Sequence, residues 1–176
     1  MALIRSVRGK KPVFGKGCFF AENATVVGEV TMGDQCSVWF NAVVRGDVHS
    51  ITMRDQVNIQ DGAVIHCTYQ EAPTVIGSRV SIAHNAIVHG CTLEDDVLVG
   101  MGAIVMDHAV VGPGSIIAAG AVVLANTVVE PGSIYAGMPA KRVKSVGPEM
   151  QEIFHRTAHN YVMYSEWFSE DTDTEK

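Results

Sequence analysis

The sequence lacks an apolar run long enough to cross a membrane. Its longest apolar stretch, residues 116–125, is interrupted by Gly120, and a membrane-spanning helix needs about 20 consecutive apolar residues. The first residues, MALIRSVRGKKPVF, also lack the apolar segment of a secretory signal peptide. We therefore expect a cytoplasmic protein.

Cysteine and charge are scarce as well. The four cysteines include no CxxC pair, which argues against a cysteine zinc site and against a disulfide framework. Charged residues make up 18% of the chain and the net charge is −6. The basic residues near the N-terminus form no extended stripe, so the composition argues against a nucleic-acid partner. At 176 residues the chain fits one domain with a modest appendage.

A six-residue period dominates the rest of the chain. Four residues after each apolar anchor position the side chain is usually small or β-branched. Two inward positions per six residues predict an all-β solenoid, a parallel β-helix of hexapeptide repeats with three hexads per coil. Its continuous core explains a hydrophobic content of 47%. The anchors, with register slips after the sixth, ninth and twelfth, are Phe14, Phe20, Val26, Met32, Val38, Val44, Met53, Ile59, Ile65, Ile76, Ile82, Val88, Leu93, Val99, Val105, Val111, Ile117, Val123, Val129 and Tyr135.

The repeat also sets the boundaries of the segments. Residues 67–74 interrupt the register and are predicted to form a loop extruded from a corner of the coil. After Pro148 the apolar positions take helical spacing, which predicts a helix that packs along the flank of the solenoid or against a neighbouring subunit. We predict an N-terminal arm at 1–13, a left-handed β-helix at 14–145, a C-terminal helix at 146–168 and an acidic disordered tail at 169–176, with the hand taken from the family resemblance below.

Within this register the cysteines fall into two pairs. Cys18 and Cys36 occupy equivalent inward positions one coil apart, and we interpret them as small reduced core residues. Cys67 and Cys91 lie next to histidines, where they could be core residues or thiols of a functional site.

Three histidines occupy distinctive places in the coil. Arg45, His66 and His89 each follow a third-face anchor in consecutive coils, so their side chains form one outward column with a spacing of about 4.8 Å. Two imidazoles at this spacing can converge on one metal ion. His84 belongs to the second face, one coil beyond Asp61, and cannot easily reach the same point within one chain.

In a trimer, a neighbouring subunit can bring its His84 next to the column of His66 and His89. We therefore expect a zinc ion at each subunit interface of a trimer, with two histidines from one chain and His84 from the next. The alternative is that the three are ordinary surface histidines. We interpret His49, His108, His155 and His159 as structural or solvated residues because none has such a placement.

At this point several strings in the sequence resemble the gamma-class carbonic anhydrase-like proteins. The similarity covers nearly the whole chain, including Asn160-Tyr161 in the C-terminal helix. It implies a left-handed parallel β-helix, a homotrimer and Zn2+, or alternatively Fe2+ or Co2+, held by three histidines from two subunits. The matching strings are Arg45-Gly46-Asp47, Asn58-Ile59-Gln60-Asp61-Gly62, His66 and His84-x4-His89-Gly90-Cys91.

The resemblance implies roles for individual residues. His66, His84 and His89 would bind the metal and leave one position for water. Zinc would lower the pKa of that water to about 7 and so supply hydroxide for attack on carbon dioxide. Gln60 resembles the residue that orients the hydroxide, and Tyr161 resembles an aromatic residue beside the pocket or a packing residue.

Other positions match a network between subunits or depart from the active pattern. Arg45, Asp47 and Asp61 resemble ion-pairing residues that organise the site or simply hold the trimer together.

Active family members have a glutamate at the position of Val48 and an acidic loop that relays protons, whereas the loop here has only Glu71 as an acid. Regeneration of the hydroxide releases a proton in each turnover, so we expect weak hydration activity.

Two other functions remain open from the sequence. Hexapeptide β-helices also include acyltransferases, and a metal site could hydrolyse acyl-CoA thioesters; the fold alone does not decide between these. The chain has no recognisable site for an organic cofactor. A non-catalytic trimeric metal-binding protein is the third reading, although structural zinc normally has four protein ligands.

Overall fold

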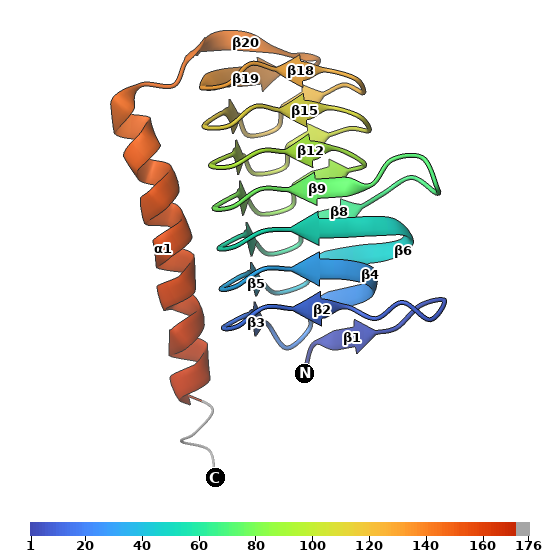
Figure 1. Cartoon of the computed structure of the whole chain (residues 1–176). Coiled ribbons are helices and arrows are strands. Elements are labelled where there is room, and N and C mark those ends of the chain that lie inside the picture. Colours follow the sequence, from blue (N-terminus) through green and yellow to red (C-terminus); the bar gives the residue numbers. More distant parts are fainter. Residues whose placement is uncertain (172–176) are drawn as a thin grey trace.

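The computed structural model describes residues 1–171, which form a β-solenoid flanked by one helix (Figure 1). The solenoid is a left-handed parallel β-helix of about seven turns. Each coil contributes one short strand to each of three faces, as the six-residue period predicts. Antiparallel β20 closes the C-terminal end by pairing with β19. The strand bounds on the second face are β3 Phe19–Phe20, β5 Ser37–Val38, β7 Asn58–Ile59, β10 Ser81–Ile82, β13 Leu98–Val99, β16 Ile116–Ile117, β19 Ser133–Gly137 and β20 Ala140–Ser145.

The first and third faces form one continuous sheet because two long strands run through the corner between them. These strands are β4 (Thr25–Met32) and β6 (Val43–Met53). The other first-face strands are β2 Val13–Phe14, β9 Thr74–Ile76, β12 Thr92–Leu93, β15 Val110–Val111 and β18 Val128–Val129. The other third-face strands are β1 Leu3–Arg5, β8 Val64–His66, β11 Ile87–His89, β14 Ile104–Val105 and β17 Val122–Val123.

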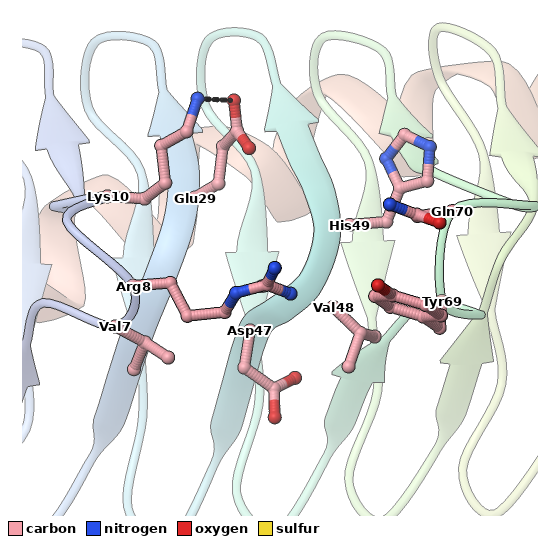
Figure 2. Close-up of a pocket in the computed structure, with 10 residues that line it drawn as sticks. Val7, Arg8, Lys10, Glu29, Asp47, Val48, His49, Tyr69 and Gln70 are labelled. Atoms are coloured by element: carbon pink, nitrogen blue, oxygen red, sulfur yellow. Dashed lines mark hydrogen bonds and ion pairs between the residues drawn. The ribbon is translucent and has the colours of Figure 1, made fainter.

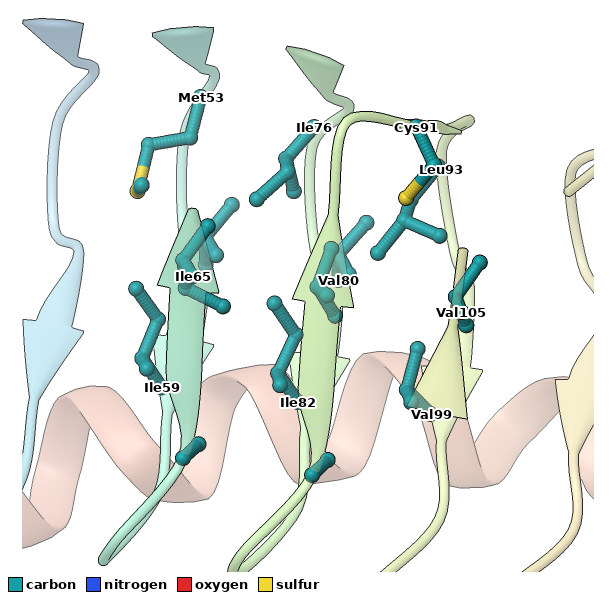
Figure 3. Close-up of a cluster of buried hydrophobic side chains, with 14 of the residues drawn as sticks. Met53, Ile59, Ile65, Ile76, Val80, Ile82, Cys91, Leu93, Val99 and Val105 are labelled. Carbon is teal, nitrogen blue, oxygen red and sulfur yellow. The ribbon is translucent and has the colours of Figure 1, made fainter. Parts of the chain in front are cut away.

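The inward residues of successive coils stack into columns that fill the core (Figure 3). Ile59, Ile82 and Val99 are fully buried in one such column on the second face. Burial of a large aliphatic side chain stabilises the fold by about 1.5–3 kcal/mol. The predicted anchors from Val26 to Tyr135 are therefore confirmed as the core of the solenoid, and Phe14 and Phe20 pack against it partly buried.

The N-terminal arm is part of the coil rather than a separate lead-in. β1 pairs in parallel with β4, so it adds a rung to the third face. A short antiparallel bridge between Val7 and Lys10 then forms a hairpin that projects from the corner. The predicted loop at 67–74 projects from the same side of the solenoid, as Figure 1 shows in green.

Helix α1 (Pro148–Asp171) packs along the second face of its own chain. Tyr161 contacts Trp39 edge to face with ring centroids 5.5 Å apart, and Phe168 contacts both Trp39 and Phe19. The helix extends three residues beyond its predicted end at residue 168, so a disordered tail beginning at 169 is wrong for 169–171; residues 172–176 of that tail lie outside the described residues. No helix among the described residues is long and apolar enough to cross a membrane.

Candidate functional site

The predicted column of outward residues is present on the third face. His66 and His89 are register partners on β8 and β11, and the pairing of Val44 with Ile65 places Arg45 next in the column. Strands of one sheet therefore bring together residues that lie far apart in the chain. The column arises because each side chain follows an inward anchor and must point outward.

The two imidazoles face each other across the coil boundary. Nδ1 of His66 lies 3.0 Å from Nε2 of His89, and the ring centroids are 5.0 Å apart. Each ring uses its other nitrogen to contact a carboxylate: Nε2 of His66 is 3.0 Å from Asp47, and Nδ1 of His89 is 2.5 Å from Asp107. Two nitrogen atoms thus converge on one point while carboxylates hold the far sides of both rings.

The electrostatics favour a neutral His66 ring beside a charged Asp47 carboxylate. Burial lowers the pKa of His66, which outweighs the opposite effect of its hydrogen bond to Asp47. Burial would raise the pKa of Asp47, but hydrogen bonds from Arg45 and His66 lower it below its usual value. The Arg45 guanidinium donates to Asp47 over 2.7 Å. A neutral imidazole keeps a lone pair available for a metal ion.

His84 lies at a different place, as its register predicts. It is at the corner after β10, where its Nδ1 is 2.8 Å from Asp61, and both side chains are more than two-fifths exposed. Among the described residues, no group of three histidine, cysteine or acidic side chains is arranged to hold a metal ion. One chain therefore offers a histidine pair on one face and a separate histidine at a corner.

Gln60 and Tyr161 both lie near that corner. Gln60 is buried, its Nε2 donates to Asn58 over 3.0 Å, and it lines an apolar groove of about 410 Å³ together with His84. Burial raises the pKa of Tyr161 to about 12, and the negative charge of Asp61 contributes to this increase. The phenol is thus neutral at physiological pH and packs on the second face.

A smaller hollow of about 230 Å³ lies beside Asp47 (Figure 2). The hairpin of the N-terminal arm, the part of β6 around Asp47 and the loop after β8 form its walls. Arg8 lies over the ring of Tyr69 at 5.9 Å. Val48 also lines this hollow. The corner next to the histidine column is therefore open to solvent.

Asp107 and two threonines belong to the site but were not predicted from the sequence. Thr68 donates from Oγ1 to Asp107 over 2.6 Å. Thr74 donates to the carbonyl of His66 and accepts the backbone N–H of Gly90. One indication of Asp107 was present in the sequence, which is its position: it stands two residues after the anchor Val105, one coil beyond His89.

The cysteines near the histidines are core residues. Cys67 and Cys91 are both 1% exposed, and burial raises the pKa of their thiols to about 11 and about 12. Cys18 is different, since a hydrogen bond from the neighbouring Cys36 thiol lowers its pKa to about 7. Cys18 is also only partly buried.

These differences predict the order of thiol alkylation. With iodoacetamide at about pH 7.5, Cys18 is expected to react first, because the thiolate is the nucleophile. Cys36, Cys67 and Cys91 should react only after unfolding. Peptide mass spectrometry of native and denatured samples measures this order. Native labelling of Cys91 at the rate of Cys18 would contradict it.

Comparisons with known proteins identify the family. Carbonic anhydrase from Geobacillus kaustophilus is 36% identical over 166 residues, which cover 94% of this chain and 91% of that protein. The chain belongs to the gamma-class carbonic anhydrase-like family. The mitochondrial gamma carbonic anhydrase 2 of Arabidopsis thaliana is 37% identical over 164 residues, and the match spans 59% of its length.

The fold and the repeat agree with this family assignment. The bacterial transferase hexapeptide family (six repeats) matches residues 90–125. The crystal structure of a hexapeptide transferase family protein from Anaplasma phagocytophilum superimposes with a TM-score of 0.90 and 37% identity, covering 94% of this chain and 98% of that one. The gamma-class family therefore shares its solenoid with proteins named as transferases.

Proposed function

We propose that this gamma-class family member is a metal-dependent lyase that hydrates carbon dioxide reversibly at sites shared between the subunits of a homotrimer. The observation that carries the proposal is the histidine pair, in which two ring nitrogens converge at 3.0 Å while Asp47 and Asp107 hold the opposite nitrogens. Metal-binding histidines typically have such a carboxylate on the second ring nitrogen.

The donor set fits a divalent ion that prefers nitrogen ligands. Imidazole suits zinc, iron(II) and cobalt(II). His66 and His89 would provide two ligands, and His84 of a neighbouring chain would provide the third. Such an ion, when bound, acts as a Lewis acid that activates water.

An exposed apolar surface supports the trimer. Met106 and Leu124 continue the column of His66 and His89 toward the C-terminal end, and Ile87 lies beside them on β11. All three are at least 37% exposed in the isolated chain. Apolar side chains gathered around polar functional groups are typical of surfaces that another chain covers.

Several residues around the histidine pair would have separate roles in the reaction. Asp47 and Asp107 orient the imidazoles, and Arg45 neutralises Asp47 on its outer side. Within the described residues, the Gln60 amide is anchored through Nε2 alone, so its oxygen remains available to orient water. The apolar groove beside Gln60 suits carbon dioxide, which has no net dipole.

Proton release is the weak step in this arrangement. Each hydration produces one proton that must reach the buffer. Glu71, the only acid in the loop at 67–74, is 69% exposed and lies 3.6 Å from His108. We therefore expect turnover to be slow in weak buffer and to rise with buffer concentration.

Metal analysis and stopped-flow kinetics test the proposal together. Anaerobically purified protein is expected to contain about one zinc, iron or cobalt ion per chain and to accelerate carbon dioxide hydration. His89→Ala should lose the metal and fall to the uncatalysed rate, because it removes a ligand. His155→Ala is a matched control, since this exposed helix histidine lies 3.9 Å from Asp96 and far from the column in sequence.

An acyl-CoA hydrolysis panel run on the same samples separates the competing enzyme function. Hydration by the wild type no faster than by His89→Ala would refute the carbonic anhydrase activity. Thioester hydrolysis that disappears in His89→Ala would instead assign the site to acyl-CoA. Bound metal without either activity would leave a non-catalytic metal-binding trimer.

A further inference from the structure

Asp107 connects three separate segments through one carboxylate. Its Oδ1 lies 2.5 Å from Nδ1 of His89 on β11, and its Oδ2 accepts the Thr68 hydroxyl at 2.6 Å from the loop after β8. Asp107 itself follows β14, one coil beyond His89. Both of its oxygens are therefore occupied.

Other aspartates at the same place in the hexad do something different. Asp34, Asp55 and Asp95 also stand two residues after an anchor, and each accepts a backbone N–H from the equivalent residue of the preceding coil at 2.7–2.8 Å. These bonds tie successive coils together. On the first face an aspartate at this position is thus a structural residue of the solenoid, whereas Asp61 on the second face contacts His84.

At Asp107 two other acceptors take over that structural bond. The equivalent amide is the N–H of Gly90, and it donates to Oγ1 of Thr74 over 3.0 Å and to the carbonyl of His66 over 3.1 Å. The Asp107 carboxylate is therefore free to turn toward the imidazole. Gly90 makes this approach feasible: with φ of 54°, a Cβ there would lie 2.5 Å from Oδ1 of Asp107 and 2.8 Å from the Cβ of Ala72.

We propose that Asp107, oriented by Thr68, is a positioning residue that fixes the tautomer and the ring orientation of His89. The carboxylate holds the proton on Nδ1, which leaves the lone pair of Nε2 directed at His66. The same contacts couple the loop after β8 to the histidine pair. The inference rests on the proposed function, because it assigns Nε2 of His89 to the metal ion.

Zinc affinity measured at a single pH by competition with a chelator tests this role. Asp107→Ala is expected to weaken zinc binding by about 10- to 100-fold, the usual effect of removing a carboxylate behind a histidine ligand. Asp107→Asn keeps the shape but loses the charge and should fall between Asp107→Ala and the wild type. Asp95→Ala is the matched control: it removes a coil-to-coil bond at the same hexad position and should leave the zinc affinity unchanged.

The threonine is tested separately. Thr68→Val is expected to weaken zinc binding less than Asp107→Ala does, and Thr68→Ser should restore the wild-type affinity, because only the hydroxyl is needed. The exposed Thr31 provides the control variant Thr31→Val. Thermal unfolding of every variant reports whether the fold is retained.

Nitrogen-15 NMR of histidine-labelled, zinc-loaded protein gives a direct readout of the tautomer. The wild type is expected to show His89 protonated at Nδ1, and Asp107→Asn should weaken or redistribute that signal. Equal zinc affinities for folded Asp107→Asn, folded Asp95→Ala and the wild type would overturn the positioning role while leaving the metal site standing. A wild type that binds no zinc, iron or cobalt would instead overturn the proposed function itself.

Discussion

Mixed trimers of His66→Ala and His84→Ala subunits are expected to regain about one quarter of the wild-type metal content, although neither variant alone binds metal. The recovery follows from the separation of the ligands: His66 and His89 share a face, whereas His84 pairs with Asp61 at a corner. A site that takes ligands from two chains is complete wherever an intact face meets an intact corner.

The expected fraction follows from the symmetry of a closed trimer. In an equal mixture, about three quarters of the trimers contain both subunit types, and each of these has one complete site of three. Unfolding and refolding the two variants together, followed by metal analysis of purified trimers, measures this value. Metal content that stays at zero in verified mixed trimers would rule out the shared site, as would full occupancy of either variant alone.

The second large effect is the loss of the trimer when charge is placed on the third face. Ile87→Glu combined with Leu124→Glu is expected to give a folded monomer that binds no metal at micromolar concentration. A carboxylate on each side chain would be buried without a partner against the neighbouring chain, which costs several kcal/mol per group. The solenoid core does not include either side chain, so the fold should persist.

The first face supplies the matched control. Val75 and Val128 are 42% and 68% exposed, compared with 37% and 48% for Ile87 and Leu124. Val75→Glu combined with Val128→Glu should therefore leave the trimer and its metal intact. Light scattering and metal analysis of both double variants compare the two faces. A stable trimer after substitution on the third face would place the interface elsewhere.

The six-residue period was sufficient to predict the coil and the columns on it. Every anchor from Val26 to Tyr135 is buried, and the pairing of His66 with His89 follows from counting hexads across one irregular insertion. The period succeeds because the inward and outward positions of a narrow coil repeat locally. The placement of His84 beside Asp61 at a corner follows from the same rule.

Helix α1 illustrates where this reasoning stopped. Helical spacing after Pro148 predicted the helix, but it left open whether the flank of the same chain or a neighbouring subunit would receive it. The aromatic contacts of Tyr161 and Phe168 with Trp39 place it on the second face of its own chain. Spacing describes which face of a helix is apolar and does not identify the surface that it covers.

The sequence by itself therefore determined the solenoid, its register and the two places where the histidines lie. Only the tertiary structure decided that Asp47 and Asp107 hold the rings of His66 and His89. It also decided that Thr74 and the His66 carbonyl accept the Gly90 amide, so that Asp107 contacts His89 instead. The physical reason is that a repeat fixes the position and direction of each Cβ. Which partner a side chain then meets depends on its rotamer and on the path of an extruded loop, and neither is periodic.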